Sequence, residues 1–311
     1  VGDQVILGDY ARTWDTNAVT IDSNGNNFQG DADTFTVDYN TEGQTINLVY
    51  ADSTQGWIPT NDIANALDHI PPPTQRAAFA YGQVGGSSNT NVKNLMNSSG
   101  VIASDVTGVG TARRMISGAT YGTDKGIFAY GYVSGNVNMS NLMNNSGVIA
   151  ADVTGVGTAR RGTGSTGYGA DKAIYAFGLA GADTNLSNLV SNVGVVASDT
   201  SGVGTSRAEL VGVRYGGDKA IMSFGTTAAS KTNLISNLGV VGSDVTQIGT
   251  ARTAPGAATY GTGTAAIAYG SGMTNIKNLV SNVGVVGSDV TGVGTSRNSI
   301  GGAGCGGDKG I

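Results

Sequence analysis

From residue 76 onward the chain is dominated by one internal repeat. The arginines that close successive copies, Arg113, Arg160, Arg207, Arg252 and Arg297, are spaced 47, 47, 45 and 45 residues apart. A unit of this size cannot shelter its own apolar side chains, so it has to bury them against neighbouring units. The copies that end at these arginines are GVIASDVTGVGTAR (100–113), GVIAADVTGVGTAR (147–160), GVVASDTSGVGTSR (194–207), GVVGSDVTQIGTAR (239–252) and GVVGSDVTGVGTSR (284–297).

A second block precedes each copy and ends on an aromatic residue and a glycine, as in FAYG (79–82) and DKAIMSFG (218–225). Residues 208–252 can be divided into four short segments, separated by glycine or asparagine, in which apolar and small residues alternate. Alternation at period two is typical of strands, and Val, Ile and Thr favour them. The sequence therefore predicts an all-β fold built from four-stranded units of 45–47 residues.

Two arrangements of such units are compatible with the repeat. The units can close radially, as the blades of a β-propeller do, or they can stack as a solenoid. Only 13% of the residues are charged, so few charges are present to protect an open sheet edge. We therefore favour radial closure, which leaves only short and protected edges.

Three features of each unit resemble a kelch repeat. An apolar strand ends in Phe177–Gly178, a second strand ends in Asp199, and a loop ends in Arg207. Kelch units usually carry a glycine pair and a tryptophan, where this chain has one glycine and the sequence GVG. The FAYG…GTAR units are also similar to those of tail-fibre and other virion proteins of marine bacteriophages. This resemblance implies a kelch-like β-propeller at residues 76–311, with five blades or as part of a larger ring.

The segment NSIGGAGCGGDKGI (298–311) repeats the first strand of a unit and the start of its second strand. It can complete the first blade of a five-bladed ring, or it can open a further unit of a larger one. We favour the first alternative.

Residues 1–70 are different in kind. Turn signals at Asn24-Gly25 and Gly30-Asp31 separate strand-like segments, which predicts a small β module. We expect a short helix at 61–70 and a proline-rich linker at 71–75. The stretches GDQVILGDYA, AVTIDSNGNNFQG, DTFTVDYN and INLVYADSTQGW resemble small β modules of phage tail fibres and virion spikes. Because such modules are commonly trimeric, the resemblance implies an oligomerisation and attachment module that forms a homotrimer and contacts other virion proteins.

Charge and composition exclude several classes of partner. The sequence pI is about 4.7 and no basic stripe is present, so we expect no nucleic acid partner. No apolar run is long enough to cross a bilayer, so we expect no membrane span. Cys305 and His69 are the only residues of their types, so we expect no metal site and no cofactor. DSNGN (22–26) lacks the downstream glutamate of a calcium loop and predicts a hairpin turn.

The repeated polar positions favour a structural role. The arginines are expected to pair with a repeated aspartate or with carbonyl groups at the junction between units. Each aspartate is expected to accept backbone N–H groups of its own turn, and the repeated asparagines Asn94, Asn141, Asn188, Asn233 and Asn278 are expected to form a ring of amide hydrogen bonds. Identical groups on every unit do not single out one catalytic position, so we expect no catalytic residue and no enzyme. These structural positions are Asp105, Arg113, Asp152, Arg160, Asp199, Arg207, Asp244, Arg252, Asp289 and Arg297.

The loops that vary between units are the predicted recognition surface, because recognition usually resides in loops on a rigid scaffold. They are small and polar, so binding would depend on many weak contacts made together. The candidate binding residues in these loops are Asn89, Asn91, Tyr132, Asn136, Asp183 and Lys231.

Together these features predict a phage virion structural protein, a tail fibre or similar appendage. It would lie on the virion, face outward, and adhere without catalysis to a host surface glycan or protein through the propeller loops. A secreted cellular β-propeller that acts as a lectin or scaffold is the alternative, and a propeller glycosidase or lyase is a third hypothesis.

Overall fold

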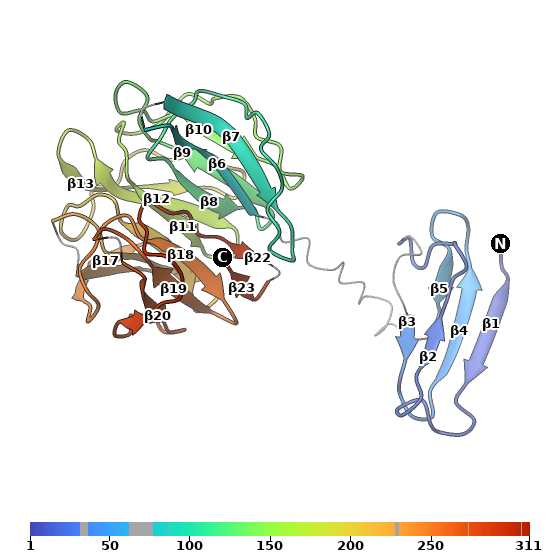
Figure 1. Ribbon diagram of the computed structural model, residues 1–311. Helices are drawn as coiled ribbons and strands as arrows, with labels where there is room; N and C mark the ends of the chain where they lie inside the picture. The colour runs from blue at the N-terminus through green and yellow to red at the C-terminus, as the bar shows by residue number, and fades with distance from the viewer. Residues whose placement is uncertain (32–36, 62–76, 87, 228–229, 273, 306) are drawn as a thin grey trace. The chain divides into compact units, whose positions relative to one another are not determined.

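The computed structural model describes residues 1–31, 37–61, 77–86, 88–227, 230–272, 274–305 and 307–311. The chain divides into two compact parts, an N-terminal domain (Val1–Pro73) and a repeat domain (Thr74–Ile311). The described residues form strands and turns and no helix, so the fold is all-β (Figure 1). None of them belongs to a helix of the length and apolarity needed to cross a membrane. The predicted helix at 61–70 and the predicted linker at 71–75 lie outside the described residues, apart from Asn61.

The N-terminal domain contains two antiparallel sheets. One has the strand order β1-β4-β5 and the other pairs β2 with β3. Its core is built mainly from aromatic and aliphatic side chains that include Trp14, Tyr39 and Ile46. The turn predicted at Asn24-Gly25 is present, since both residues have positive φ angles, of 54° and 80°. The strands are β1 (Gln4–Gly8), β2 (Val19–Ile21), β3 (Val37–Tyr39), β4 (Thr45–Tyr50) and β5 (Trp57–Pro59).

The repeat domain consists of five units, which we number by the arginine that closes each one. The units are 77–113, 114–160, 161–207, 208–252 and 253–297, and a C-terminal segment, 298–311, follows them. The first unit contains β6 (Ala77–Val84) and β7 (Ser88–Met96), and the second contains β8 (Ser117–Tyr121), β9 (Lys125–Ala129) and β10 (Ser140–Met143). The third contains β11 (Gly164–Tyr168), β12 (Lys172–Leu179) and β13 (Asp183–Val190), and the fourth contains β14 (Val211–Tyr215), β15 (Lys219–Ser223), β16 (Lys231–Ile235) and β17 (Val241–Thr246). The fifth contains β18 (Gly256–Tyr260), β19 (Thr264–Ala268), β20 (Ile276–Val280) and β21 (Val290–Thr291), and the C-terminal segment contains β22 (Gly304–Cys305) and β23 (Lys309–Gly310).

The predicted four strands per unit are complete in two of the units. The fourth and fifth units form antiparallel sheets ordered β14-β15-β16-β17 and β18-β19-β20-β21. In the second and third units the fourth strand is reduced to isolated bridges, such as Ser187 with Thr200 and Val190 with Val196. The first unit has the β6-β7 pair and two such bridges.

The apolar core is shared between successive units, as the repeat requires. Ile174 and Phe177 of the third unit pack with Leu210 and Met222 of the fourth. Equivalent clusters join the second unit to the third and the fourth unit to the fifth. Adjacent first strands lie side by side: β8 with β11 (Figure 1), β11 with β14 and β14 with β18. Each sheet is therefore stabilised mainly by burial against its neighbours.

The C-terminal segment continues this series. β22 and β23 form their own hairpin beside β18. A Cβ atom placed on Gly301 would lie 3.3 Å from the Phe79 ring of the first unit, just as one on Gly164 of the third unit would meet Met222 of the fourth. β22 pairs with β23 while β6 pairs with β7, so the hairpin lies between the fifth unit and the first and does not supply the first strand of the first sheet.

Candidate functional site

Each junction between units is closed by a buried arginine. Arg113, Arg160 and Arg207 have fully buried side chains, and Arg252 is 2% exposed. Arg207 donates from Nε to the Phe224 carbonyl at 2.9 Å and from an Nη to the Met222 carbonyl at 3.3 Å, both in the next unit. A planar guanidinium with five donors suits such a set of fixed acceptors. Burial lowers the pKa of Arg207 and of Arg252 to about 10, so both remain charged at neutral pH.

An asparagine of the next unit joins each arginine to an aspartate. Arg207 donates to Asn233 Oδ1 at 2.6 Å, and Asn233 Nδ2 donates to Asp244 Oδ1 at 3.0 Å. Asp244 also accepts the backbone N–H and the hydroxyl of Thr205, which belongs to the preceding unit. Each aspartate was expected to accept backbone N–H groups of its own turn. Instead, it accepts hydrogen bonds from a threonine in the loop of the preceding unit. The same Arg–Asn–Asp chain recurs at Arg113–Asn141–Asp152, Arg160–Asn188–Asp199 and Arg252–Asn278–Asp289.

These hydrogen bonds favour the charged form of the aspartates. Burial alone would raise the pKa of Asp244, but bonds from Thr205, Asn233 and Lys231 outweigh it and hold this pKa far below its ordinary value. The pKa values of Asp152, Asp199 and Asp289 are lowered in the same way, by the equivalent threonines and asparagines.

The other face of each arginine stacks on an aromatic residue of its own unit, which lies within the second strand or directly after it. The guanidinium carbon of Arg207 lies 4.0 Å from the centre of the Phe177 ring. Such cation–π contacts stabilise desolvated pairs by about 2 kcal/mol. All five aromatics lie in the left-handed region, where bulky residues are rare. Their φ angles are 64° at Tyr81, 63° at Tyr130, 62° at Phe177, 65° at Phe224 and 64° at Tyr269.

Several of the predicted loop residues also connect neighbouring units. Asn89 accepts a hydrogen bond from Arg114 at 3.1 Å and donates to the Tyr132 carbonyl. Asn136 accepts from Arg161 at 3.0 Å, and both arginines stack on the Tyr132 ring, each at 4.8 Å. The structure thus brings three of the six candidates together around one tyrosine.

The remaining three candidates lie apart from this cluster. Asn91 donates to two carbonyls of its own unit, those of Gly108 and Gly110. Asp183 accepts from Thr226 and Thr227 of the next unit, and Lys231 forms an ion pair with Asp244 at 3.3 Å. Ligand binding by any of the six stays a prediction, and each already has a partner within the protein.

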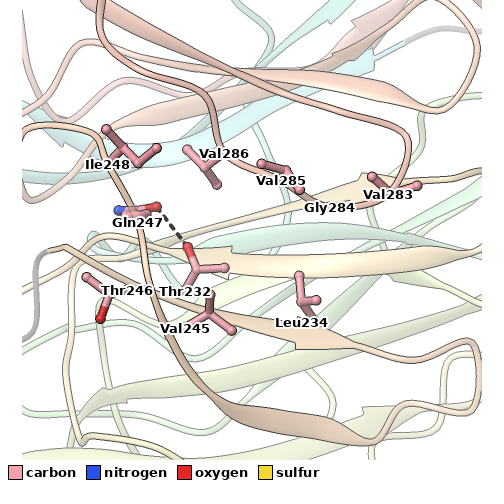
Figure 2. Close-up of a pocket in the computed structure, with 10 residues that line it drawn as sticks. All are labelled: Thr232, Leu234, Val245, Thr246, Gln247, Ile248, Val283, Gly284, Val285 and Val286. Atoms are coloured by element: carbon pink, nitrogen blue, oxygen red, sulfur yellow. Dashed lines mark hydrogen bonds between the residues drawn. The ribbon is translucent and has the colours of Figure 1, made fainter.

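Sequence reasoning missed an apolar groove that recurs between units. Figure 2 shows the groove between the fourth and fifth units, where Leu234 and Val245 face Val283 and Val285 across a volume of about 200 Å³. The hydroxyl of Thr232 donates to Gln247 Oε1 at 2.8 Å at one end of it (Figure 2). The same repeat positions line a groove between the second and third units: Ser140, Leu142, Val153, Thr154, Val156, Val193, Gly194, Val195 and Val196.

The groove is lined by aliphatic side chains that remain in solvent. Ile248 is 78% exposed, Val283 68% and Val285 60%. Contiguous exposed apolar surface is typical of interaction sites. The available signal was two consecutive β-branched residues at the start of the fourth strand, as in Val285-Val286. Consecutive residues of a strand point to opposite faces, so Val286 is buried while Val285 stays exposed.

A further kind of candidate site is a group of side chains that could hold a metal ion. The described residues contain no group of three or more His, Cys, Asp or Glu side chains that could hold a metal ion. Cys305 is buried, and His69 lies outside the described residues. The Asp-Lys pairs form exposed ion pairs at hairpin turns, as between Asp171 and Lys172 at 3.0 Å.

No protein-family model matches the chain, and no curated protein matches it. Among solved structures it is similar to a fungal alcohol oxidase of the AA5 family, solved in complex with copper. The TM-score is 0.46 and the identity 11%, over 75% of this chain and 66% of the oxidase chain. The chain therefore spans just under two thirds of that structure's length.

This finding corrects the prediction that the chain is not an enzyme. The neighbour is an alcohol oxidase, so the prediction from sequence is withdrawn. The likeness transfers neither a copper site nor an activity to this chain.

Proposed function

We propose that the repeat domain is a kelch-like β-propeller and that the chain is a virion appendage protein of the tail-fibre type. Support for radial closure comes from the shared cores of successive sheets and from the C-terminal hairpin, which lies beside both β18 and Phe79. The resemblance of the repeats and of the N-terminal domain to phage proteins supports the virion assignment.

Within this assignment, the repeat domain adheres to a host surface glycan or protein through its rim. The observation that carries this proposal is the repeated apolar groove with exposed Ile248, Val283 and Val285. Similar grooves on one rigid scaffold can bind a repetitive surface at several points, and weak contacts then combine into avidity. The grooves replace the loop tips as the expected contact region, because the candidate loop side chains already have partners within the protein, in their own unit or in a neighbouring one.

The N-terminal domain supplies the attachment and trimer contacts in this proposal. It exposes Ile6 by 64% and Tyr10 completely, and a neighbouring copy can cover such side chains. Light scattering of the purified chain measures its molar mass and so tests the trimer. A monomeric mass at micromolar concentration would contradict the proposed trimer.

A cell-binding assay tests adhesion. Labelled wild-type chain and two variants are incubated with host cells. The groove variant carries both Ile248→Asp and Val285→Asp, and the control variant carries Val84→Asp at an exposed position outside the groove. We expect binding to fall at least tenfold for the groove variant and to be unchanged for the control. Equal binding by all three chains would refute the groove. Mass spectrometry of purified particles tests the virion assignment separately, and absence of the chain from them would refute it.

A further inference from the structure

Two arginines of the loop cluster around Tyr132 keep hydrogen-bond donors that the protein does not use. Arg114 and Arg161 each donate from Nη1, to Asn89 Oδ1 and Asn136 Oδ1 respectively. The Nε and Nη2 atoms of both side chains have no partner among the described residues, and they are not fully buried. These two nitrogens form one edge of a guanidinium, and parallel N–H groups along such an edge bind both oxygens of a carboxylate. Each arginine therefore presents a bidentate edge to solvent.

The positive charge of this cluster is not balanced by a carboxylate. None of the ion pairs that the described residues form includes Arg114 or Arg161. By contrast, Lys172 and Lys219 each pair with the aspartate that precedes them. The two guanidinium carbons each lie 4.8 Å from the centre of the Tyr132 ring, so two positive charges share a small area. Like charges held this close repel each other, and a bound anion would offset the repulsion.

The other units show that the fold does not require these arginines. Ala208 and Thr253 occupy the equivalent positions of the fourth and fifth units, directly after the junction arginine. There the backbone N–H groups donate to the hydroxyls of Thr226 and Ser271, both at 2.8 Å, and these two residues stand at the position of Tyr132. Small side chains thus fill the same place in the same backbone frame. Within the second to fifth units the arginine–tyrosine cluster occurs once, as a binding site does and a repeated structural contact does not.

We propose that Arg114 and Arg161 form a binding site for the carboxylate groups of an acidic saccharide. The backbone at this position is already paired, because Arg114 and Tyr132 exchange two hydrogen bonds and the Val133 N–H donates to the Gly135 carbonyl. These residues offer a peptide no strand edge, so recognition comes from side chains. The Tyr132 hydroxyl reaches solvent without a partner in the described part of the chain. It can both donate to and accept from a sugar hydroxyl.

In this arrangement the arginines contact the ligand, and the two asparagines are positioning residues. Asn89 donates to the carbonyls of Tyr132 and Val133, and Asn136 donates to that of Leu179, so both amides are held in place. Each amide oxygen in turn fixes one side of a guanidinium and leaves the other side to solvent. Groups that are fixed before a ligand arrives lose less entropy on binding. This proposal does not rest on the proposed function, because it requires neither a virion nor adhesion through the groove.

Calorimetry with an oligomer of galacturonic acid tests the site, and its methyl ester, which carries no charge, is the matched ligand control. We expect saturable binding of the acid that weakens as the salt concentration rises, and no binding of the ester. The test variant combines Arg114→Ala with Arg161→Ala and is expected to bind at least tenfold more weakly. The control variant combines Lys172→Ala with Lys219→Ala, which removes the same charge from exposed ion pairs, and is expected to bind as the wild type does.

The arginine variants are expected to fold, because Ala208 and Thr253 already stand at the equivalent positions. Similar melting temperatures check this. The two single variants, each expected to bind at least threefold more weakly, keep the test decisive if the double variant unfolds. The proposal is overturned if the acid does not bind, if its methyl ester binds equally well, or if the arginine variants bind as the wild type does. It is also overturned if an oligomer of aspartate binds more tightly than the saccharide, because the ligand is then an acidic peptide.

Discussion

At the scale of single residues, the junction arginine acts as a buried connector rather than as a charge on a rim. Arg207 contacts the Phe177 ring of its own unit, two carbonyls of the next unit and Asn233. A lysine could not reproduce this set, because its ammonium is compact and lacks the planar fork of donors. The ring and asparagine contacts repeat at the three other junctions, with two carbonyls of the next unit at Arg113 and one each at Arg160 and Arg252. The arginine is therefore a determinant of how units pack.

Replacement of the repeated arginine by alanine is expected to lower the stability of the protein strongly at position 207 and only slightly at position 297. Arg207→Ala leaves buried carbonyls and Asn233 without a donor, so we expect the free energy of unfolding to fall by about 3–5 kcal/mol. Arg297→Ala is the matched control, because this arginine is exposed, and we expect a loss below about 1 kcal/mol. Urea denaturation of both variants measures the difference, and equal losses would contradict the connector role.

The aspartates at the junctions make the stability of the fold dependent on pH in the acidic range. The pKa of Asp244 in the folded protein is lowered, so its ionised form stabilises the fold above the unfolded value of about 4. This stabilisation is lost as the pH falls below about 4 toward the folded pKa, since protonation removes the acceptor of Thr205. We expect Asp244→Asn to unfold less steeply with acid than the wild type between about pH 4 and pH 2, as followed by circular dichroism. Parallel acid titrations of the two chains would contradict this reasoning.

At the scale of elements, the tight turn before each fourth strand brings successive sheets together. Gly239 has a φ of +82°, and a Cβ atom on it would lie 2.8 Å from Leu189 and 2.9 Å from the Tyr168 ring of the preceding unit. Gly217 has a similar φ of +84° but open space around it. The two positions separate the effect of backbone conformation from that of packing.

Alanine at these two glycines is expected to have unequal effects. Gly217→Ala should cost about 1–2 kcal/mol, because an alanine is strained at positive φ. Gly239→Ala should cost about 1–3 kcal/mol more, since the added methyl group also overlaps the neighbouring unit. Thermal denaturation with calorimetry compares them, and a Gly239→Ala chain as stable as Gly217→Ala would show that the sheets can move apart at no cost.

The local elements could be predicted from sequence, but their partners could not. Alternation in DKAIMSFG indicated a strand, and β15 occupies Lys219–Ser223. The role of Asp244 was not predictable, because Thr205 lies 39 residues earlier and only the packing of two units brings them together. Nor did the sequence indicate that Tyr132 would lie between Arg114 and Arg161, since these residues come from successive loops. The grooves depend on the same packing between units.

At the scale of the whole molecule, each unit of the repeat domain depends on the units beside it. Shared cores join the second unit to the third, the third to the fourth and the fourth to the fifth. A chain of this kind approximates a one-dimensional array, in which a change at one position is felt most by its immediate neighbours. The C-terminal hairpin touches β18 on one side and Phe79 on the other, so it is the element through which the first and fifth units can affect each other.

Removal of residues 298–311 tests this coupling. The deletion uncovers apolar surface on β18 and on the Phe79 side of the first unit, so local opening there becomes easier. We expect amide hydrogen exchange to accelerate at least tenfold in β6 and β18 and to change little in β12 of the third unit, whose two neighbours remain in place. Point variants at Gly301 that keep the hairpin but crowd Phe79 should affect β6 more than β18. Uniform acceleration across all five units would mean that the domain opens as a single cooperative body, and protection unchanged in β6 would mean that the hairpin does not support the first unit.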